Sequence, residues 1–551
     1  MYNEFFSIDQ NSHPLWDAVP KLDALARHGW HGTHFVEDVD VAFTRRSAAV
    51  GDTHLELARE QFYRGGMSDW GATLFYSDIL GRLPLDVRQL EPYSGWTTAA
   101  LSRRLGMGVD VLYDTYSPSD NWQLVGPSFA GAPTRHRVIG DLRVGEISPH
   151  LLELLRHART DFERIFPGKK ARQRIKSWFD QEDARVKELL RDYEAGTLVD
   201  LYRAWMSAHL SKNVKISATS ELLSSDKPNM PNHELLEVFL SNYEAVAALY
   251  NEAVQETASG LNLLNVNKGE LPFFAVIRRD NRLFRISLTL RGENVVAEDF
   301  VWPLAGPHRS LPLQQMRRDG LFCIVGKALL LVLHARFKPL GKVLALPYNG
   351  SLYMPAAHRL EQKLFNNGYL PQETFPIYRV KLNFLEHWQA CKTVIQPPAY
   401  LQPTFGTGEY RACDFAEELF GRIKQARSKL EQMTSPDGRD RIMKHLFAEE
   451  MQLEEELEKR RRDLARDPET RAQAAEVWAQ LKEIKKRLQV KIIDWIVQQL
   501  RVMDLEYYNS RGAILPQSIA LGGESFYKQL LADAEIYAER PETNQVAYGQ
   551  K

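Results

Sequence analysis

Apolar residues recur at helical spacing through the C-terminal part of the chain, from about residue 413 to residue 508. Glu alternates with Lys and Arg between them, so opposite charges flank an apolar seam. A period of about 3.5 to 3.6 residues with flanking charges is typical of helices that pack on one another along a narrow seam. Turns are expected at 435–438 and at 467–468, where proline suits the start of the next helix. The pattern predicts a helical hairpin or a three-helix arm.

The remainder of the chain alternates β-type runs with helical ones. The first 60 residues predict a helix followed by a loop, and a helix around 97–105 precedes a predicted strand over 109–113. Residues 149–210 have helical spacing throughout, and one amphipathic helix is expected over 234–259. This alternation indicates an α/β body.

Runs rich in β-branched and aromatic residues predict strands in the second half of that body. They cover residues 273–277, 283–290, 294–301, 342–346 and 377–385. Turn residues join the first of these runs directly, so an antiparallel set is expected there.

The patterns divide the chain into five parts. Residues 1–148 form the N-terminal half of an α/β core, and 149–260 form a mainly helical connecting segment. Residues 261–412 form the C-terminal half of the core. The arm covers 413–508, and a C-terminal segment with a polar tail covers 509–551.

Composition limits the partners and the compartment. The 551 residues carry a formal net charge of -1, so no overall field attracts nucleic acid or an anionic membrane, and neither partner is expected. The chain has three cysteines and no CxxC pair, which fits a reducing compartment. The N-terminus lacks the basic and apolar regions of a secretory signal, and the longest apolar run, 321–335, is too short to span a bilayer. A cytoplasmic protein is expected.

A polar loop follows the strand predicted over 109–113. In open α/β sheets ligands gather at the carboxyl ends of the strands, so this loop is a candidate binding site. Its carboxylates are Asp114 and Asp120, and its hydroxyl and amide groups are those of Ser117, Ser119 and Asn121. Ordinary turn chemistry with Asx caps is the alternative explanation.

A second candidate is a cationic group that follows a loop of small residues at 126–131. Arg135, His136 and Arg137 could together hold an anionic substrate. The same charges could equally serve to solvate the edge of a loop.

A third candidate combines a predicted strand, a loop and the start of a helix. The loop holds Tyr348, Asn349, Gly350 and Ser351, and the helix that follows carries His358. Free backbone N–H groups at a helix start often bind anions. A plain connection between a strand and a helix is the alternative.

The chain matches no known metal-binding motif and no familiar nucleotide-binding motif. His28, His31 and His34 have a spacing that matches neither one helical face nor a zinc motif, even with Glu37 and Asp38 nearby, so no metal is predicted. The chain also lacks both the GxGxxG and the GxxxxGK[ST] patterns that mark familiar dinucleotide and phosphate-binding loops.

The order of these elements resembles that of the bacillithiol synthase family, which are cysteine-adding ligases, and of uncharacterised bacterial relatives. The likeness is strongest over about 235–505. It includes the run Leu-Pro-Phe-Phe at 271–274, the block from Pro347 through His358, the run Pro-Ile-Tyr-Arg at 376–379, and the helices that follow.

The resemblance implies a Rossmann-like core with helical insertions and a long C-terminal antiparallel coiled-coil arm that forms a homodimer. It also implies a biosynthetic ligase that joins an amino acid, such as cysteine, or a related amine to a small polar acceptor. The resemblance allows a nucleotide cofactor such as ATP or ADP. In this interpretation Asp114 and Asp120 orient or deprotonate the amine, backbone N–H groups near Gly350 hold an anion, and Arg135 or Arg137 neutralises charge.

The chain departs from the family pattern in its acidic motif. Only Asp114 and Asp120 correspond to that motif, which contains a histidine in the family, whereas Tyr348, Gly350 and His358 fit. An acidic residue usual in the family is replaced near Met354. Either the substrate differs or the activity has been lost. A noncatalytic assembly or partner-binding protein that works through the arm is the alternative function.

Overall fold

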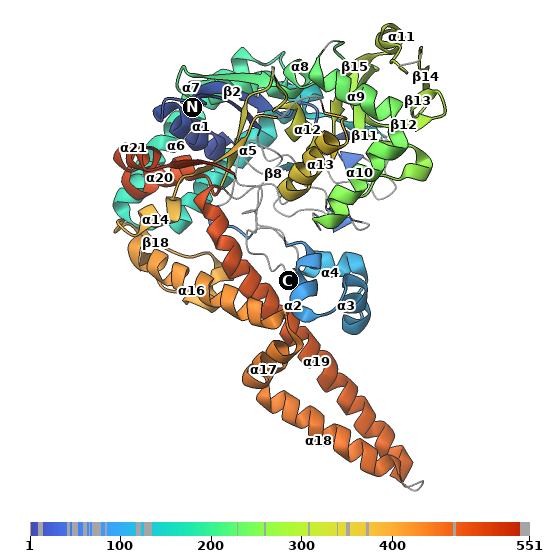
Figure 1. Ribbon diagram of the computed structural model, residues 1–551. Coiled ribbons are helices and arrows are strands. Elements are labelled where there is room, and N and C mark those ends of the chain that lie inside the picture. The colour runs from blue at the N-terminus through green and yellow to red at the C-terminus, as the bar shows by residue number, and fades with distance from the viewer. Residues whose placement is uncertain are drawn as a thin grey trace.

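A mostly parallel sheet, an antiparallel sheet and a projecting helical arm make up this α/β protein (Figure 1). The computed structural model describes residues 2–8, 15–40, 45–46, 53–54, 56–58, 63–64, 67–68, 79–82, 85–116, 123–125, 135–228, 230–257, 261–306, 309–338, 340–348, 353–370, 374–466 and 470–539. Within these ranges, no helix is both long enough and apolar enough to cross a bilayer.

Six strands drawn from the whole length of the chain form the first sheet, in the order β10-β2-β1-β16-β17-β20. They are β1 (Glu4–Ile8), β2 (His31–Val36), β10 (Val214–Ala218), β16 (Val343–Pro347), β17 (Ile377–Lys381) and β20 (Glu535–Ala538). The first five in the order are parallel, and β20 closes one edge antiparallel to β17. Burial on both faces explains why β16 is entirely apolar and why every residue of β1 after Glu4 is buried.

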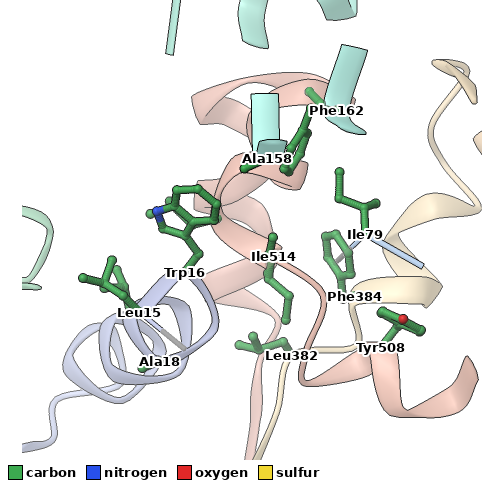
Figure 2. Packing of buried hydrophobic residues seen from close by; sticks show 14 of the residues in the cluster. Leu15, Trp16, Ala18, Ile79, Ala158, Phe162, Leu382, Phe384, Tyr508 and Ile514 are labelled. Carbon is green, nitrogen blue, oxygen red and sulfur yellow. The ribbon is translucent and has the colours of Figure 1, made fainter. Parts of the chain in front are cut away.

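The two faces of this sheet belong to different apolar clusters. Phe5 of β1 packs into the cluster that contains α1 (Leu15–Arg27), whereas its neighbour Phe6 packs into the cluster that contains α13 (Met354–Asn366). Because side chains alternate along a strand, α1 and α13 cover opposite faces. Figure 2 shows part of the first cluster, where Trp16 of α1 lies near Ile514 and Leu382.

Helices from the middle and the end of the chain complete the first cluster. They are α5 (Val144–Ile165), α6 (Lys169–Asp192), α7 (Leu198–His209), α20 (Ile514–Gly522) and α21 (Glu524–Ala532). Buried Asp17 of α1 accepts hydrogen bonds from the backbone N–H groups of Gly512 and Ile514, at 3.1 and 2.9 Å. The N-terminal helix therefore holds the start of α20, almost 500 residues later in the chain.

The second sheet is antiparallel, with the order β14-β13-β12-β11-β15, and β9 pairs with β12 at its side. Its strands are β9 (Arg135–Arg137), β11 (Glu270–Arg279), β12 (Arg282–Arg291), β13 (Asn294–Ala297), β14 (Phe300–Pro303) and β15 (Leu321–Gly326). Helices α8 (Thr219–Leu222), α9 (Pro231–Ser241), α10 (Tyr243–Glu256), α11 (Leu313–Arg318) and α12 (Ala328–His334) accompany it.

The arm consists of α16 (Ala412–Met433), α17 (Pro436–Leu446), α18 (Ala448–Ala465) and α19 (Arg471–Asp504). Lys491 pairs with Glu450 near one end of α18, and Lys485 approaches Glu458 at 3.5 Å further along, so α18 and α19 run antiparallel. Figure 1 shows this pair extending away from the body. The predicted helix start after residue 435 is confirmed, because Ser435 Oγ accepts from Gly438 N at 3.1 Å.

The base of the arm is part of the body. The helices η1 (Val87–Leu90), α2 (Glu91–Ser94), α3 (Thr98–Leu105) and α4 (Val109–Tyr116) share one apolar cluster with α16 and α19. The short helix η6 (Leu505–Asn509) follows α19, and its Leu505 and Tyr508 enter the first cluster. The first part of α16 therefore packs on the body, and the projecting part of the arm begins further along the chain.

The remaining described elements are short. They are β3 (Arg45–Arg46), β4 (Thr53–His54), β5 (Glu56–Ala58), β6 (Tyr63–Arg64), β7 (Met67–Ser68), β8 (Gln123–Val125), η2 (Ile139–Asp141), η3 (Val266–Lys268), α14 (Phe384–Trp388), β18 (Val394–Ile395), η4 (Ala399–Leu401), α15 (Gln402–Phe405) and β19 (Tyr410–Arg411).

Some elements differ from the prediction. Residues 109–113 are not a strand but part of α4, whose Leu112, Tyr113 and Tyr116 are buried on one helical face while Val111 is exposed. The helix expected in the first 60 residues is present as α1, but a strand that was not predicted, β1, precedes it. The single helix expected over 234–259 is two helices, α9 and α10, which meet at Asn242.

Candidate functional site at the carboxyl edge of the parallel sheet

The chain connections of the parallel sheet run in opposite directions from the neighbouring strands β1 and β16. The chain leaves β1 through α1 toward β2, and leaves β16 through α13 toward β17, on the other side. In open α/β sheets, connections that diverge in this way leave a crevice at the carboxyl ends of the strands, where ligands bind. The sheet order therefore places the candidate site beyond Ile8 and Pro347, the last residues of these neighbouring strands.

An acidic run follows β2 at this edge. Asp38 lies beyond the end of β2 and is buried, and its carboxylate accepts hydrogen bonds from the backbone N–H of Ser220, at 3.0 Å, and from the Ser220 hydroxyl. Burial raises the pKa of Asp38, and the two bonds from Ser220 only partly oppose this. The ends of β2 and β10 are thus joined through a carboxyl group that takes up a proton more readily than usual.

The second sheet contributes a cation to the same run. Arg285 of β12 donates from Nη1 to Asp40 Oδ1 at 3.2 Å, and its guanidinium carbon lies 3.9 Å from the centre of the Phe274 ring. Burial lowers the pKa of Arg285, while Asp40 and Glu37 favour its charged form. The acidic run after β2 therefore stands between the parallel and the antiparallel sheets.

A second polar group lies on the other side of the divergence, where β16 and β17 end. Tyr348 follows β16, and Lys381, the last residue of β17, lies with Nζ 5.4 Å from the centre of the Tyr348 ring. Lys381 also approaches Glu386 Oε1 of α14 at 3.3 Å. Burial raises the pKa of Tyr348, with a smaller contribution from Glu506 of η6, so its phenol is neutral near pH 7.

Arg137 lies in a buried ion cluster. It pairs with Asp141 and, through Nη2, with Glu146 Oε2 at 2.6 Å, and its side chain is 3% exposed. Asp141 in turn accepts from the backbone N–H of Leu283 at 2.8 Å. Two carboxylates already balance this guanidinium, which favours a structural role in joining β9 to α5 and β12.

His358 also lies in a buried group. Its Nε2 is 2.9 Å from Glu539 Oε1, and Glu539 Oε2 accepts from Arg379 Nε at 2.6 Å. Arg379 also donates to the carbonyl of Pro347 at 3.0 Å. His358, on α13, therefore helps to hold the chain just after the C-terminal strand β20 against β17.

Most other predicted site residues lie wholly or partly outside the described part of the structure. Arg135 and His136 lie on β9, opposite Ile286 and Arg285 of β12, and Asp114 lies on α4, but the side chains of these three residues are outside the described part of the structure. Ser117, Ser119, Asp120, Asn121, Asn349, Gly350 and Ser351 lie wholly outside the described residues. Their roles stay predictions. Tyr348 alone of the predicted binding residues is described at the carboxyl edge.

The histidines near residue 30 occupy a strand. His31 lies on one face of β2, 3.3 Å from Glu4, while buried His34 lies on the other and its Nδ1 is 3.1 Å from Ser7 Oγ. Strand residues three positions apart point to opposite faces, so these two cannot bind one ion. Within the described ranges, no cluster of three or more His, Cys, Asp or Glu side chains is arranged to hold a metal.

Comparison with known proteins adds no assignment. No family model, no curated protein and no solved structure matches this chain.

Proposed function

We propose that the protein is a ligase-like enzyme that joins an amino acid or a related amine to a small polar acceptor. Its ligands would bind at the carboxyl edge of a Rossmann-like parallel sheet. The observation that supports the proposal is the divergence of the chain between β1 and β16, because sheets with this topology bind ligands at the carboxyl ends of the diverging strands. The family resemblance over residues 235–505 supplies the reaction class.

The acidic run after β2 is the best candidate for handling the amine. Burial raises the pKa of Asp38, and this residue lies two positions beyond the end of a core strand, β2. Asp114, to which the sequence pattern assigned this role, lies on α4 beside the arm. Asp38 would therefore orient or deprotonate the amine, with Arg285 and Asp40 fixing the loop that carries it.

A nucleotide would bind on the opposite side of the divergence, at the start of α13. The N-terminus of α13, a helix of 13 residues, follows β16 at the carboxyl edge, and backbone N–H groups at such a helix start favour phosphate. Residues 349–353 and the first turn of α13 would hold the group. ATP would supply activation of an acid or an alcohol for transfer, and the protein residues would supply orientation and exclusion of water.

A thermal-shift screen against nucleotides, amino acids and sugar conjugates tests the proposal. We expect at least one class to raise the melting temperature of the full-length protein by several degrees, because a ligand that binds only the folded state stabilises it. Asp38→Asn should remove that increase. Asp437→Asn, in the first turn of α17, is the matched control and should leave it intact. Equal ligand-induced shifts in the Asp38 and Asp437 variants would exclude the acidic run from the site.

An assembly role for the arm is the second candidate. Leu446, Leu453 and Trp478 are exposed by 37%, 39% and 38% along the helices of the arm, and packing against a second arm would cover them. We propose that the arm is a coiled coil that pairs with a second copy of the chain.

Shortening the arm separates the two functions. Replacing residues 454–485 with a short Gly/Ser linker removes the outer hairpin and keeps the base that packs on α2 to α4. The expected product is a monomer by light scattering that still shows the ligand-induced thermal shift. If the shortened protein still dimerises with unchanged affinity, the arm does not mediate assembly. If it is a stable monomer that no longer binds the ligand, ligand binding depends on dimerisation through the arm.

A further inference from the structure

Two of the three cysteines of the chain lie beside each other at the base of the arm. Cys391 follows α14, Cys413 lies in the first turn of α16, and the backbone N–H of Cys413 donates to the carbonyl oxygen of Cys391 at 2.8 Å. The N–H of Ala412 donates in the same way to Thr393, also at 2.8 Å, next to the paired strands β18 and β19. The segment after α14 therefore runs beside the start of the arm helix, as the positions of α14, β18 and α16 in Figure 1 show.

The backbone geometry allows a disulfide between these two cysteines. A backbone N–H···O bond holds the Cα atoms of its two residues about 5 to 6 Å apart, and disulfides join Cα atoms that are roughly 4.4 to 6.8 Å apart. Helical Cα–Cβ bonds tilt toward the N-terminus of the helix, which is the end of α16 that faces Cys391. The side chain of Cys413 therefore leans toward the segment that carries Cys391.

The thiol of Cys391 can leave its present partner without leaving a buried acceptor unpaired. Its Sγ donates to the carbonyl oxygen of Leu521 at 3.4 Å. The same oxygen also accepts from Thr393 Oγ1 at 2.7 Å and from Arg174 Nη2 at 3.0 Å. A buried acceptor that loses all its donors is costly, whereas this carbonyl keeps two of them.

Cys413 is the more accessible of the two thiols. It is half-buried, whereas Cys391 is 8% exposed. Cys413 Sγ donates to Asp414 Oδ1 at 3.4 Å, and the same carboxylate pairs with Arg411 at 2.6 Å. A small oxidant in solvent therefore meets Cys413 first, and Cys391 is the neighbouring thiol that can react with the oxidised sulfur.

We propose that Cys391 and Cys413 form a reversible modification site, which becomes an intramolecular disulfide when the protein meets hydrogen peroxide. The Cys413 thiolate attacks one peroxide oxygen, the O–O bond breaks, and a sulfenic acid and one water form. The Cys391 thiolate then attacks the Cys413 sulfur, and the S–O bond breaks with release of a second water. Each water takes up one thiol proton, so one peroxide oxidises two thiols, and a thiol reductant reverses the bond by exchange.

The disulfide ties the first turn of the arm helix α16 to the segment that follows α14, and so fixes the base of the arm on the body. Transient disulfides of this kind occur as redox sensors in reducing compartments, where the thiols are otherwise free. The inference goes beyond the proposed function and does not depend on it.

Thiol counting after oxidation of the full-length protein tests this site. The reduced protein is treated with a small excess of hydrogen peroxide, unfolded and alkylated with N-ethylmaleimide, and its intact mass gives the number of free thiols. We expect one of the three thiols to remain, together with a linked peptide pair that contains Cys391 and Cys413, and dithiothreitol should restore all three. The backbone N–H of Cys413 should also exchange with deuterium at least about 10-fold more slowly in the oxidised protein.

Cys323→Ala is the matched control, because Cys323 is buried in β15 and belongs to a different apolar cluster from Cys391. This variant should form the same disulfide and keep no free thiol, whereas Cys391→Ser and Cys413→Ser should each form no intramolecular disulfide. Three free thiols after oxidation, a bond to Cys323, a bond between two copies of the chain, or a sulfinic acid at Cys413 without a disulfide would overturn the proposal. The linked peptide pair is identified in the unaltered protein, so the result stands even if a serine variant fails to fold.

Discussion

Acidification from pH 6.5 to pH 4 is expected to destabilise the folded protein by about 3 kcal/mol through His334 alone. His334 ends α12 and is 2% exposed, and its ring lies 6.3 Å from that of Phe273 and 5.8 Å from that of Phe337. Neither ring nitrogen has a hydrogen-bond partner of normal geometry among the described residues. Burial lowers the pKa of His334 to about 3, against a small opposite effect of the Leu223 backbone.

The sign follows from the two end states. Below pH 6.5 the unfolded chain takes up a proton at this histidine, while the folded chain does so only near pH 3. Between these values the free energy of unfolding falls by about 1.4 kcal/mol for each pH unit of acidification. Above pH 6.5 the imidazole is neutral in both states, so its contribution is constant and fully present.

Urea unfolding at pH values from 4 to 7.5 measures this effect. The glutamine in His334→Gln cannot titrate, so the free energy of unfolding of this variant should fall less steeply with acidification. The slope should be smaller by up to about 1.4 kcal/mol for each pH unit. This difference in slope is expected even if altered packing makes the variant less stable at pH 7. His445→Gln, at an exposed position on α17, should retain the original slope. The prediction is wrong if the slopes of the unaltered protein and of His334→Gln coincide.

Glu539→Gln is expected to cost about 3 to 5 kcal/mol of stability at pH 7, because it leaves Arg379 buried without its carboxylate. The Glu539 and Arg379 side chains are 2% and 6% exposed. Burial alone would raise the pKa of Glu539, but the hydrogen bond from His358 and the charge of Arg379 outweigh it and hold that pKa below its usual value. This contribution is therefore present above the unfolded-state pKa of about 4.5 and is lost as the pH falls through the folded-state value.

Denaturant unfolding and hydrogen exchange check the result together. The amide protons of β20 should exchange much faster in Glu539→Gln, because the strand loses the ion pair that ties its end to β17. Glu535→Gln, a matched change at an exposed position of the same strand, should alter stability by less than about 0.5 kcal/mol. A stable Glu539→Gln protein with protected β20 amides would show that Arg379 finds another partner.

The sequence predicted the elements whose signal is local. The arm helices have a long apolar period, and β11 and β12 are joined directly by a turn at residues 280 and 281, where both backbones are left-handed. The strand β1 was missed, because five residues with a single Phe-Phe pair carry little periodic signal. The helix α4 was taken for a strand, because Val109 and Val111 favour β structure while tertiary packing on the arm base decides the outcome.

The candidate site was predictable only in part. Tyr348 follows a strand whose apolar run is plain in the sequence, and the structure places it at the carboxyl edge. Asp38 was noticed only beside the nearby histidines, because its partner Ser220 lies 182 residues away. The contact between Arg285 and Asp40 spans 245 residues. Such pairs depend on strand order across the whole chain, which local patterns do not contain.

The parallel sheet also sets a condition on synthesis of the protein. Strand β1 leaves the ribosome first, but its neighbour β16 is made more than 300 residues later, and β20 only near the end. At about 5 to 20 residues per second, β1 waits roughly 20 to 70 s for that neighbour. During this delay its apolar edge is open, so we expect the nascent chain to depend on chaperones and to aggregate when translation stalls between β10 and β16.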